Sequence, residues 1–195
     1  RRVLFRSRTS VEAFPQTAGY LSADPGRVAH WAAELAALGD GPKVGVLWKS
    51  LKMNAARSRY FSPFEQWRTV LETAGVRFVN LQYGDCAEEL AAAKAAGLEI
   101  WNPSGIDLKQ DLDDVAALTA ALDVTLGPSN ATTQLSSGVG AETWMISAPG
   151  SWPRLGTDRL PWQPAVRVFE TPTLTDWGPV MAEVAAALSA RAGTP

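Results

Sequence analysis

The sequence predicts an α/β fold in which a Rossmann-like parallel sheet of about five or six strands is flanked by helices. Segments with helical periodicity alternate with short apolar segments along most of the chain. The apolar segments are continuous runs, such as KVGVLW at 43–48, and continuous runs are typical of parallel strands buried on both faces. No internal repeat and no linker divides the chain, so we expect one domain from 21 to 195.

The expected helices begin at capping residues. Asp24 is a natural N-cap for a helix over 25–38, which carries an apolar stripe and is followed by a glycine. Ser62 and Glu65 have the spacing of a capping box for a second helix, and Asp85 precedes a third. Further helices are expected at 111–122, 132–138 and 177–191, and strands at 43–48, 76–82, 98–101, 124–127 and 143–146.

Composition narrows the class of protein. The net charge is -2 with acidic and basic residues interspersed, which argues against a nucleic-acid-binding surface. The single cysteine, Cys86, cannot form an internal disulfide and fits a reducing compartment, so we expect a cytoplasmic protein. One histidine and one cysteine leave little for a transition-metal site, and we expect neither a metal nor another cofactor. No apolar run reaches the roughly 18 residues that a membrane span needs.

The first 20 residues are expected to be a non-native or disordered lead-in. The chain begins with Arg1 and not with Met. Residues 1–8 are basic, match neither a secretory signal nor an element of a fold, and resemble translated sequencing-adapter sequence. We therefore expect the chain to be a C-terminal fragment of a longer bacterial protein.

Two loops carry residues suited to a pyrophosphate group, because ligands of such sheets bind where strands end and helices begin. The segment GPSNATTQ at 127–134 is a strand-to-helix junction whose small residues expose backbone N–H groups at a helix N-terminus. Ordinary N-capping by Ser129 or Asn130 is the alternative. The loop at 48–59 is basic, and either a phosphate site or a solvated loop explains its cations, which are Lys49, Lys52, Arg57 and Arg59.

The order of the segments is more specific than any one of them. GVLWKS, LQYGD, DLDDVAALTAALDV, GPSNATTQLSSGVGAETWM and SWPRLGTDRLPW follow one another along the chain. This order resembles the C-terminal half of the GT-B glycosyltransferases, and most closely family-9-like proteins that carry tetratricopeptide repeats upstream. The resemblance covers most of 21–188, and LQYGD and LGTDRLPW are its most specific parts.

The resemblance implies that the domain is one half of a GT-B fold and binds a nucleotide-diphosphate sugar. The acceptor would lie across a cleft, on an N-terminal half that precedes this chain together with the tetratricopeptide repeats. Because the general base often comes from that half, we do not expect the isolated chain to be a complete enzyme.

The resemblance also implies a set of donor-site residues, carried over by position. They are Trp48, Lys49, Ser50 and Arg57 in the first phosphate-side loop, Gln82 and Tyr83 near the base or ribose, Asp111 and Asp114 at the start of a helix that begins D-x-x-D-x-A in the family, Ser129, Asn130, Ala131, Thr132, Thr133 and Gln134 under the diphosphate, and Trp152 in the loop that follows.

One departure from the family pattern bears on activity. Family-9 enzymes commonly have Asp-Thr-x-x-Ala-His-Leu at the anion-binding helix, where this chain has SNATTQL at 129–135. Ser129 replaces the Asp and Gln134 replaces the His, so Gln134 can donate a hydrogen bond to phosphate but cannot carry charge or shuttle a proton. Two alternatives stay open: a degenerate, non-catalytic module on a repeat scaffold, and an unrelated doubly wound binding domain.

Other aromatic and polar residues have structural interpretations. Trp31, Trp67, Trp144 and Trp177 are expected in the core, because they lie on apolar helix stripes or in a buried strand. Trp152 and Trp162 flank proline-rich turns, where packing is expected more than sugar stacking. His30 is expected to be a partly exposed helix residue, and Cys86 a small helix residue.

Overall fold

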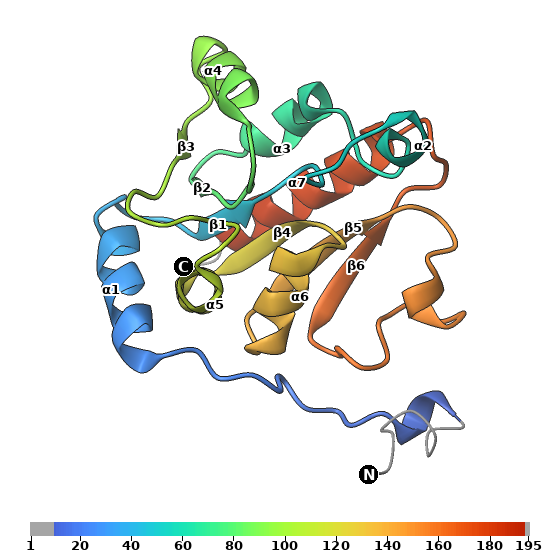
Figure 1. Ribbon diagram of the computed structural model, residues 1–195. Helices are drawn as coiled ribbons and strands as arrows, with labels where there is room; N and C mark the ends of the chain where they lie inside the picture. The colour runs from blue at the N-terminus through green and yellow to red at the C-terminus, as the bar shows by residue number, and fades with distance from the viewer. Residues whose placement is uncertain (1–9, 194–195) are drawn as a thin grey trace.

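A computed structural model describes residues 10–193 of the 195-residue chain. The strands form one sheet in the order β3-β2-β1-β4-β5-β6 (Figure 1). All neighbouring strands are parallel, which confirms the predicted α/β fold with a Rossmann-like sheet. The strands are β1 (Lys43–Val46), β2 (Arg77–Asn80), β3 (Ile100–Trp101), β4 (Val124–Pro128), β5 (Thr143–Ser147) and β6 (Val166–Glu170).

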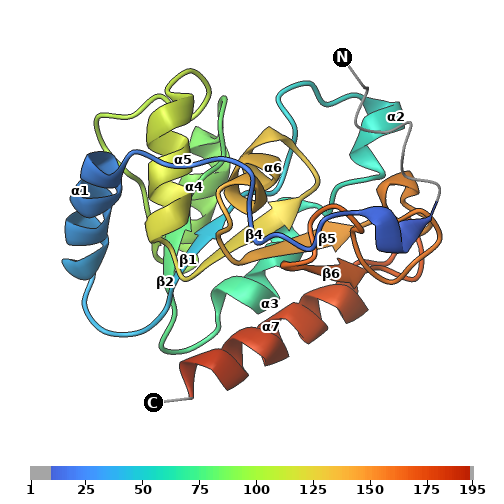
Figure 2. The ribbon, with the colours of Figure 1, turned by 90° about the horizontal axis from the view of Figure 1, so that it is seen from below.

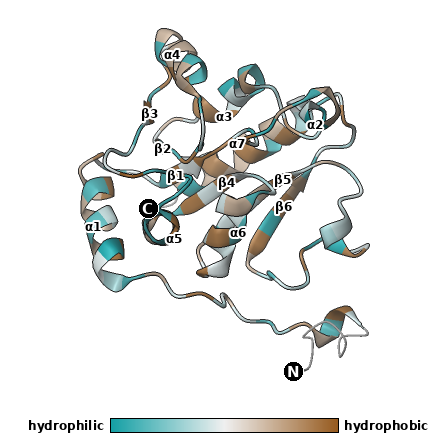
Figure 3. Ribbon diagram, viewed as in Figure 1, coloured by the Kyte–Doolittle hydropathy of each residue, from teal (hydrophilic) through white to brown (hydrophobic). Residues whose placement is uncertain are grey.

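Helices cover both faces of the sheet (Figure 2). They are α1 (Pro25–Ala36), α2 (Ala55–Ser58), α3 (Arg68–Leu71), α4 (Ala87–Ala95), α5 (Leu112–Ala121), α6 (Ala131–Gly138) and α7 (Gly178–Ala192), with 3-10 turns η1 (Val11–Ala13), η2 (Phe64–Trp67) and η3 (Trp152–Arg154). One core cluster joins α1 and α5 to the sheet, and a second joins η2, α3 and α7 to its other face. Coloured by hydropathy, the helices carry both apolar and polar residues along their length (Figure 3).

Side chains of β1 and of the residue directly after it pack into both core clusters, because successive side chains of an extended chain point to opposite faces of the sheet. Val44 and Val46 pack with the α3–α7 cluster, and Leu47 packs with the α1–α5 cluster. Gly45 has no room for a side chain, since a Cβ there would lie 2.4 Å from Cδ1 of Leu81. The four tryptophans expected in the core are buried there, as predicted: Trp31, Trp67, Trp144 and Trp177.

Helix α1 begins as the sequence predicts. The side chain of Asp24 accepts a hydrogen bond from the N–H of Arg27 at 2.8 Å, so Asp24 is the N-cap. The helix packs against α5, and His30 lies exposed with its ring against the edge of Trp31.

Two predicted helix starts differ in detail from the structure. Pro63 occupies the cap position of the second helix and offers no side-chain acceptor, so the capping box of Ser62 and Glu65 does not form. The chain instead makes the 3-10 turn η2 before α3. Cys86, not Asp85, is the N-cap of α4, although the Asp85 carboxylate still accepts a hydrogen bond from the N–H of Ala87 at 3.2 Å.

The strand β6 was not predicted. Its sequence, VRVFE, mixes exposed charged residues with buried apolar ones, and within residues 10–193 β6 is an edge strand that pairs with β5 alone. Phe169 packs into the core, while the guanidinium of Arg167 lies over the rings of Trp144 and Phe169. A search for continuous apolar runs therefore does not detect this strand.

The lead-in contacts the domain over the part that the structure describes. The backbone N–H groups of Tyr20 and Leu21 each donate to the carbonyl of Gly138 at 2.8 Å. Phe14 is buried, and its ring lies 5.9 Å from that of Trp162. The domain boundary at residue 20 stays a prediction, and residues 1–8 lie outside the described range. Within residues 10–193, no helix is long and apolar enough to cross a membrane.

Candidate functional site

The candidate site lies at the carboxyl edge of the sheet, between β1 and β4. The chain order runs outward from these two neighbouring strands in opposite directions, and ligands of doubly wound sheets bind where the order reverses. A hydrogen bond of 3.1 Å from the N–H of Leu47 to the carbonyl of Leu126 extends the β1–β4 pairing to this edge. The structure thus brings the loop after β1 and the loop after β4 together, as the sequence predicts.

Helix α6 starts at this edge with a closed capping box. The side chain of Asn130 accepts from the N–H of Thr133 at 3.2 Å, and the hydroxyl of Thr133 accepts from the N–H of Asn130 at 3.0 Å. That hydroxyl also donates to the carbonyl of Pro128 at 2.9 Å. The alternative interpretation, in which Asn130 is an ordinary N-cap, is therefore correct. The cap also fixes the direction of the helix N-terminus.

The first turn of α6 also keeps unused donors. Within residues 10–193, the backbone N–H groups of Ala131 and Thr132 form no hydrogen bond. Ser129 and Ala131 are exposed, whereas Thr132 is only 4% exposed. The backbone, together with the exposed hydroxyl of Ser129, thus offers donors to an anion at this position.

Gln134 lies one turn further along α6 and is held by Gln163, which was not among the predicted site residues. The side-chain nitrogen Nε2 of Gln163 donates to Oε1 of Gln134 at 2.8 Å. Gln163 belongs to the loop between β5 and β6, and 29 residues separate the two amides in the chain.

The loop after β1 is braced from β2. Oε1 of Gln82 accepts from the backbone N–H groups of Trp48 and Lys49, at 2.9 Å each, and its Nε2 donates to the carbonyl of Tyr83 at 2.8 Å. Gln82 is 2% exposed, so its side chain is committed to the backbone. The structure therefore assigns Gln82 a bracing role, while Tyr83 beside it is half-buried.

Lys49 lies at the predicted place but has a partner. Its ammonium group forms an ion pair with the carboxylate of Glu89 on α4, and Nε1 of Trp48 donates to the same oxygen at 3.4 Å. Burial by itself raises the pKa of the Glu89 carboxyl, but hydrogen bonds from Lys49, the backbone and Trp48 outweigh it and hold the pKa below its usual value. No signal in the sequence identified Glu89, because the fold alone brings α4 beside the β1 loop.

Unlike Lys49, Arg57 forms no ion pair within residues 10–193. It lies in the short helix α2, is exposed, and its guanidinium donates to the hydroxyl of Ser50 at 3.2 Å. It can therefore turn toward an anion without breaking an ion pair.

Two predicted site residues, Asp111 and Asp114, have hydrogen-bond partners outside the loops after β1 and β4. Asp114 forms an ion pair with Arg27 and accepts from Nε1 of Trp31 at 3.2 Å, so it joins α5 to α1. The Asp111 carboxylate accepts from the N–H of Asp107 at 2.8 Å within the loop before α5. The partners of Asp114 belong to α1, and the partner of Asp111 lies in the loop before α5.

Trp152 was expected to pack against its proline-rich turn, and the structure places it differently. It is 79% exposed, so the expectation that it packs is wrong, and only a tilted contact with the half-buried Trp162, 6.3 Å between ring centres, supports it. The short η3 turn directs this ring outward, which leaves it open to solvent.

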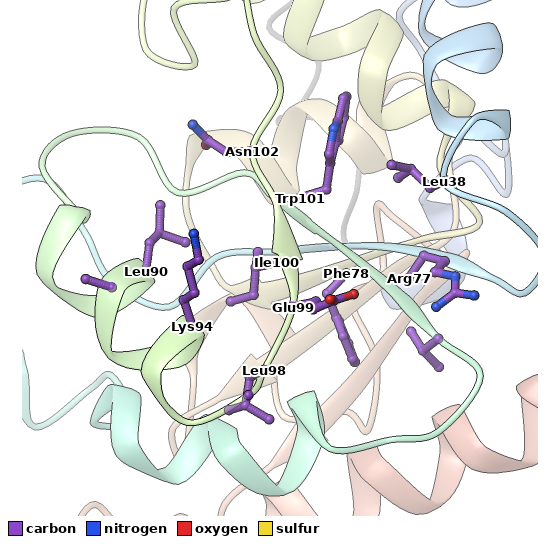
Figure 4. Close-up of a pocket in the computed structure, with 13 residues that line it drawn as sticks. Leu38, Arg77, Phe78, Leu90, Lys94, Leu98, Glu99, Ile100, Trp101 and Asn102 are labelled. Carbon is purple, nitrogen blue, oxygen red and sulfur yellow. The ribbon is translucent and has the colours of Figure 1, made fainter.

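Two cavities flank the β2–β3 side of the sheet. One, of about 520 Å³, lies beyond the carboxyl ends of β2 and β3 and is lined by Gln82, Tyr83, Asn102 and Lys109 among others. The other, of about 660 Å³, runs along the edge strand β3, where Phe78, Leu90 and Ile100 line it (Figure 4). The first coincides with the place predicted for a base or ribose, and the second does not reach the β1–β4 crevice.

Two further observations concern metals and thiols. In the described part of the chain, no three His, Cys, Asp or Glu side chains cluster closely enough to hold a metal ion. Burial raises the pKa of the Cys86 thiol, which lies inside the α3–α7 core cluster. Cys86 is thus a small buried residue, but it lies at the N-cap position before α4 and not within the helix as expected.

Comparison with known sequences identifies one close relative. No family model matches the chain. Protein FlbA of Caulobacter vibrioides is 58% identical over 182 residues, which make up 93% of this chain and 30% of FlbA. The chain thus spans less than a third of the length of that relative.

Comparison with solved structures identifies the fold. E. coli ADP-heptose lps heptosyltransferase II superposes with a TM-score of 0.58 at 16% identity, covering 92% of this chain and 56% of that one. A glycosyl transferase family 9 protein from Veillonella parvula DSM 2008 gives a TM-score of 0.55 at 14% identity, covering 80% and 44%. The chain therefore has a Rossmann-like fold that resembles the GT-B domains of family 9 glycosyltransferases.

Proposed function

We propose that this chain is the donor-binding domain of a glycosyltransferase and holds a nucleotide-diphosphate sugar at the carboxyl edge between β1 and β4. The observation that carries the proposal is the start of α6, where unused backbone N–H groups lie at the point of strand-order reversal. A helix N-terminus contributes about 0.3 to 1 kcal/mol to the binding of an anion, and its unpaired N–H groups add directed hydrogen bonds.

The surrounding residues fit a diphosphate and a nucleoside. Ser129 adds an exposed hydroxyl, and Arg57 adds a cation that forms no ion pair with any residue of 10–193. The cavity beside Tyr83 is large enough for a base or ribose. The fold similarity to an enzyme named for ADP-heptose supports the same class of donor.

The chemistry that this domain would supply is stabilisation of the departing nucleotide diphosphate. Preorganised N–H donors and basic side chains stabilise such a charge as it develops, without a proton-transferring group in this domain. We propose that the acceptor and the general base come from other parts of a longer protein, including an N-terminal half and tetratricopeptide repeats.

A second candidate is a non-catalytic module within a protein-interaction scaffold. Two observations favour it: the charge of Lys49 is neutralised by Glu89, and Gln134 carries no charge. The two candidates differ in one measurable property, which is binding of a nucleotide-diphosphate sugar.

A thermal-shift panel of UDP-, GDP-, ADP- and CMP-sugars separates the candidates. A donor site raises the melting temperature with at least one diphosphate sugar, since a ligand at about 100 times its Kd stabilises the native state by about 2.7 kcal/mol. CMP-sugars carry one phosphate and serve as the control for the diphosphate. No shift with any of them would favour the scaffold module.

The variant Ser129→Asp tests whether the diphosphate lies at the N-terminus of α6. A carboxylate at this exposed position should abolish the ligand-induced shift by charge repulsion and leave the ligand-free melting temperature unchanged. Ser189→Asp, on the exposed face of α7, is the matched control and should bind as the parent does. Unchanged binding by Ser129→Asp would move the diphosphate away from α6.

A further inference from the structure

Gln163 is a buried donor with a fixed position. It is 4% exposed, its backbone N–H donates to the carbonyl of Leu160, and its own carbonyl accepts from the N–H of Val166, at 3.0 Å each. These two backbone bonds hold the residue at the end of the loop, just before β6. From there its Nε2 donates to Oε1 of Gln134 at 2.8 Å.

This contact sets the orientation of the Gln134 amide. Since the oxygen of Gln134 is turned to Gln163, its Nε2 is turned away and forms no hydrogen bond with any described residue. The side-chain amide of Asn130 is oriented in the same way: its oxygen accepts from the N–H of Thr133, and its Nδ2 is buried with no partner in the described part of the chain. The two residues are four apart on α6, so they lie on one face of the helix.

Packing does not explain why an amide is buried at position 163. The oxygen Oε1 of Gln163 has no hydrogen-bond partner among residues 10–193, and a half-satisfied buried amide costs folding free energy that an apolar side chain would not. The bond that this amide does make is the one that orients Gln134.

We infer that Gln163 is a positioning residue that holds Gln134 so that its N–H₂ group donates to the diphosphate of a nucleotide sugar. This inference rests on the proposed function. The α6 side of the site then recognises the anion through neutral amides and backbone N–H groups, with Gln134 at the position where the resembled family carries a histidine. Neither amide titrates, so the affinity does not change between pH 6 and pH 8.

A double-mutant cycle tests whether Gln163 acts through Gln134. Affinities for UDP-glucose, GDP-glucose and ADP-glucose are measured calorimetrically for the parent, Gln134→Met, Gln163→Met and the double variant. Each single variant is expected to bind about tenfold more weakly. The double variant should bind no more weakly than Gln134→Met, because the effect of Gln163 vanishes once its target is absent. Gln66→Met, in η2, is the matched control with parental affinity.

The variant Gln163→Glu tests the polarity of the pair. A carboxylate only accepts, so Gln134 would have to donate to it and would turn its oxygen toward the anion. Affinity should fall by at least as much as in Gln163→Met. In the parent, the side-chain N–H₂ resonances of Gln134 should shift on addition of the sugar, and this measurement does not depend on how well any variant folds.

The outcomes separate the inference from the proposed function. A parent that binds none of the three sugars overturns both. A parent that binds, with Gln163→Met equal to it, with losses that multiply in the double variant, or with unshifted Gln134 resonances, overturns the inference alone. A tenfold change in parental affinity between pH 6 and pH 8 would also overturn it.

Discussion

At the scale of single residues, the charge at the β1 loop is set by Lys49 and Glu89. Because the pKa of Glu89 is lowered in the folded protein, the carboxylate contributes stability above its ordinary pKa, 4.5, and this contribution is lost as the pH falls through the folded pKa. Glu89→Gln should therefore destabilise the protein at pH 7, by about 1 kcal/mol or less, and by less near pH 3.

Urea denaturation at both pH values checks this expectation. Glu72→Gln is the control, because the Glu72 carboxylate pairs with Arg68 at 2.7 Å on the exposed surface of α3 and should matter less. If Glu89→Gln lost as much stability at pH 3 as at pH 7, the charge of the carboxylate would not be the cause of the loss.

Two of the four cations of the loop after β1, Lys49 and Arg57, should both contribute to donor affinity. Lys49→Ala and Arg57→Ala each remove a charge-assisted contact and are expected to weaken binding of the nucleotide-diphosphate sugar by roughly 1.5 to 3 kcal/mol without unfolding the domain. Calorimetry measures the affinity, with Arg68→Ala on α3 as the control cation. Parental affinity in both variants would remove this loop from the site.

At the scale of elements, α6 depends on its cap. Asn130→Ala deletes the acceptor for the N–H of Thr133, and loss of an N-cap side chain typically costs about 1 kcal/mol. We expect a lower midpoint of urea unfolding with an unchanged slope. Asn54 caps the exposed, four-residue α2 in the same way, so Asn54→Ala is the matched control and should cost less. Equal losses would show that burial of α6 adds nothing to its cap.

Local sequence predicts some elements well and others poorly, for identifiable reasons. The start of α1 depends on Asp24 and the N–H of Arg27, three residues apart, so the sequence predicts it correctly. The start of the second helix depends on Pro63, which takes the cap position and displaces the expected Ser62 box. Strand β6 lies at an exposed edge, where its charged residues are tolerated, and its pattern therefore lacks the apolar run of a central strand.

At the scale of the whole molecule, the lead-in docks on the end of α6 through a close backbone approach. A Cβ at Gly19 would lie 2.6 Å from the nitrogen of Gly140 and 2.7 Å from the oxygen of Gly138, and neither backbone atom can give way cheaply. Gly19→Ala should therefore release the lead-in and speed hydrogen exchange at the amides of Tyr20 and Leu21 by about tenfold or more.

Exchange measured by NMR also provides the controls for the lead-in. Amides of the central strands should keep their protection in Gly19→Ala, and the exposed Thr17→Ala should resemble the parent throughout. Unchanged protection at Tyr20 and Leu21 would show that their bonds to Gly138 do not hold the lead-in in place.

The sequence by itself determined the alternation of strands and helices, the parallel sheet, the buried tryptophans and the two loops that meet at one edge. These features follow from helical periodicity, apolar runs and capping, which act between residues close together in the chain. Only the tertiary structure decided which partners the site residues have. Lys49 meets Glu89 across 40 residues and Gln134 meets Gln163 across 29, because these pairs depend on which strands lie side by side in the sheet and on the course of the loops between them.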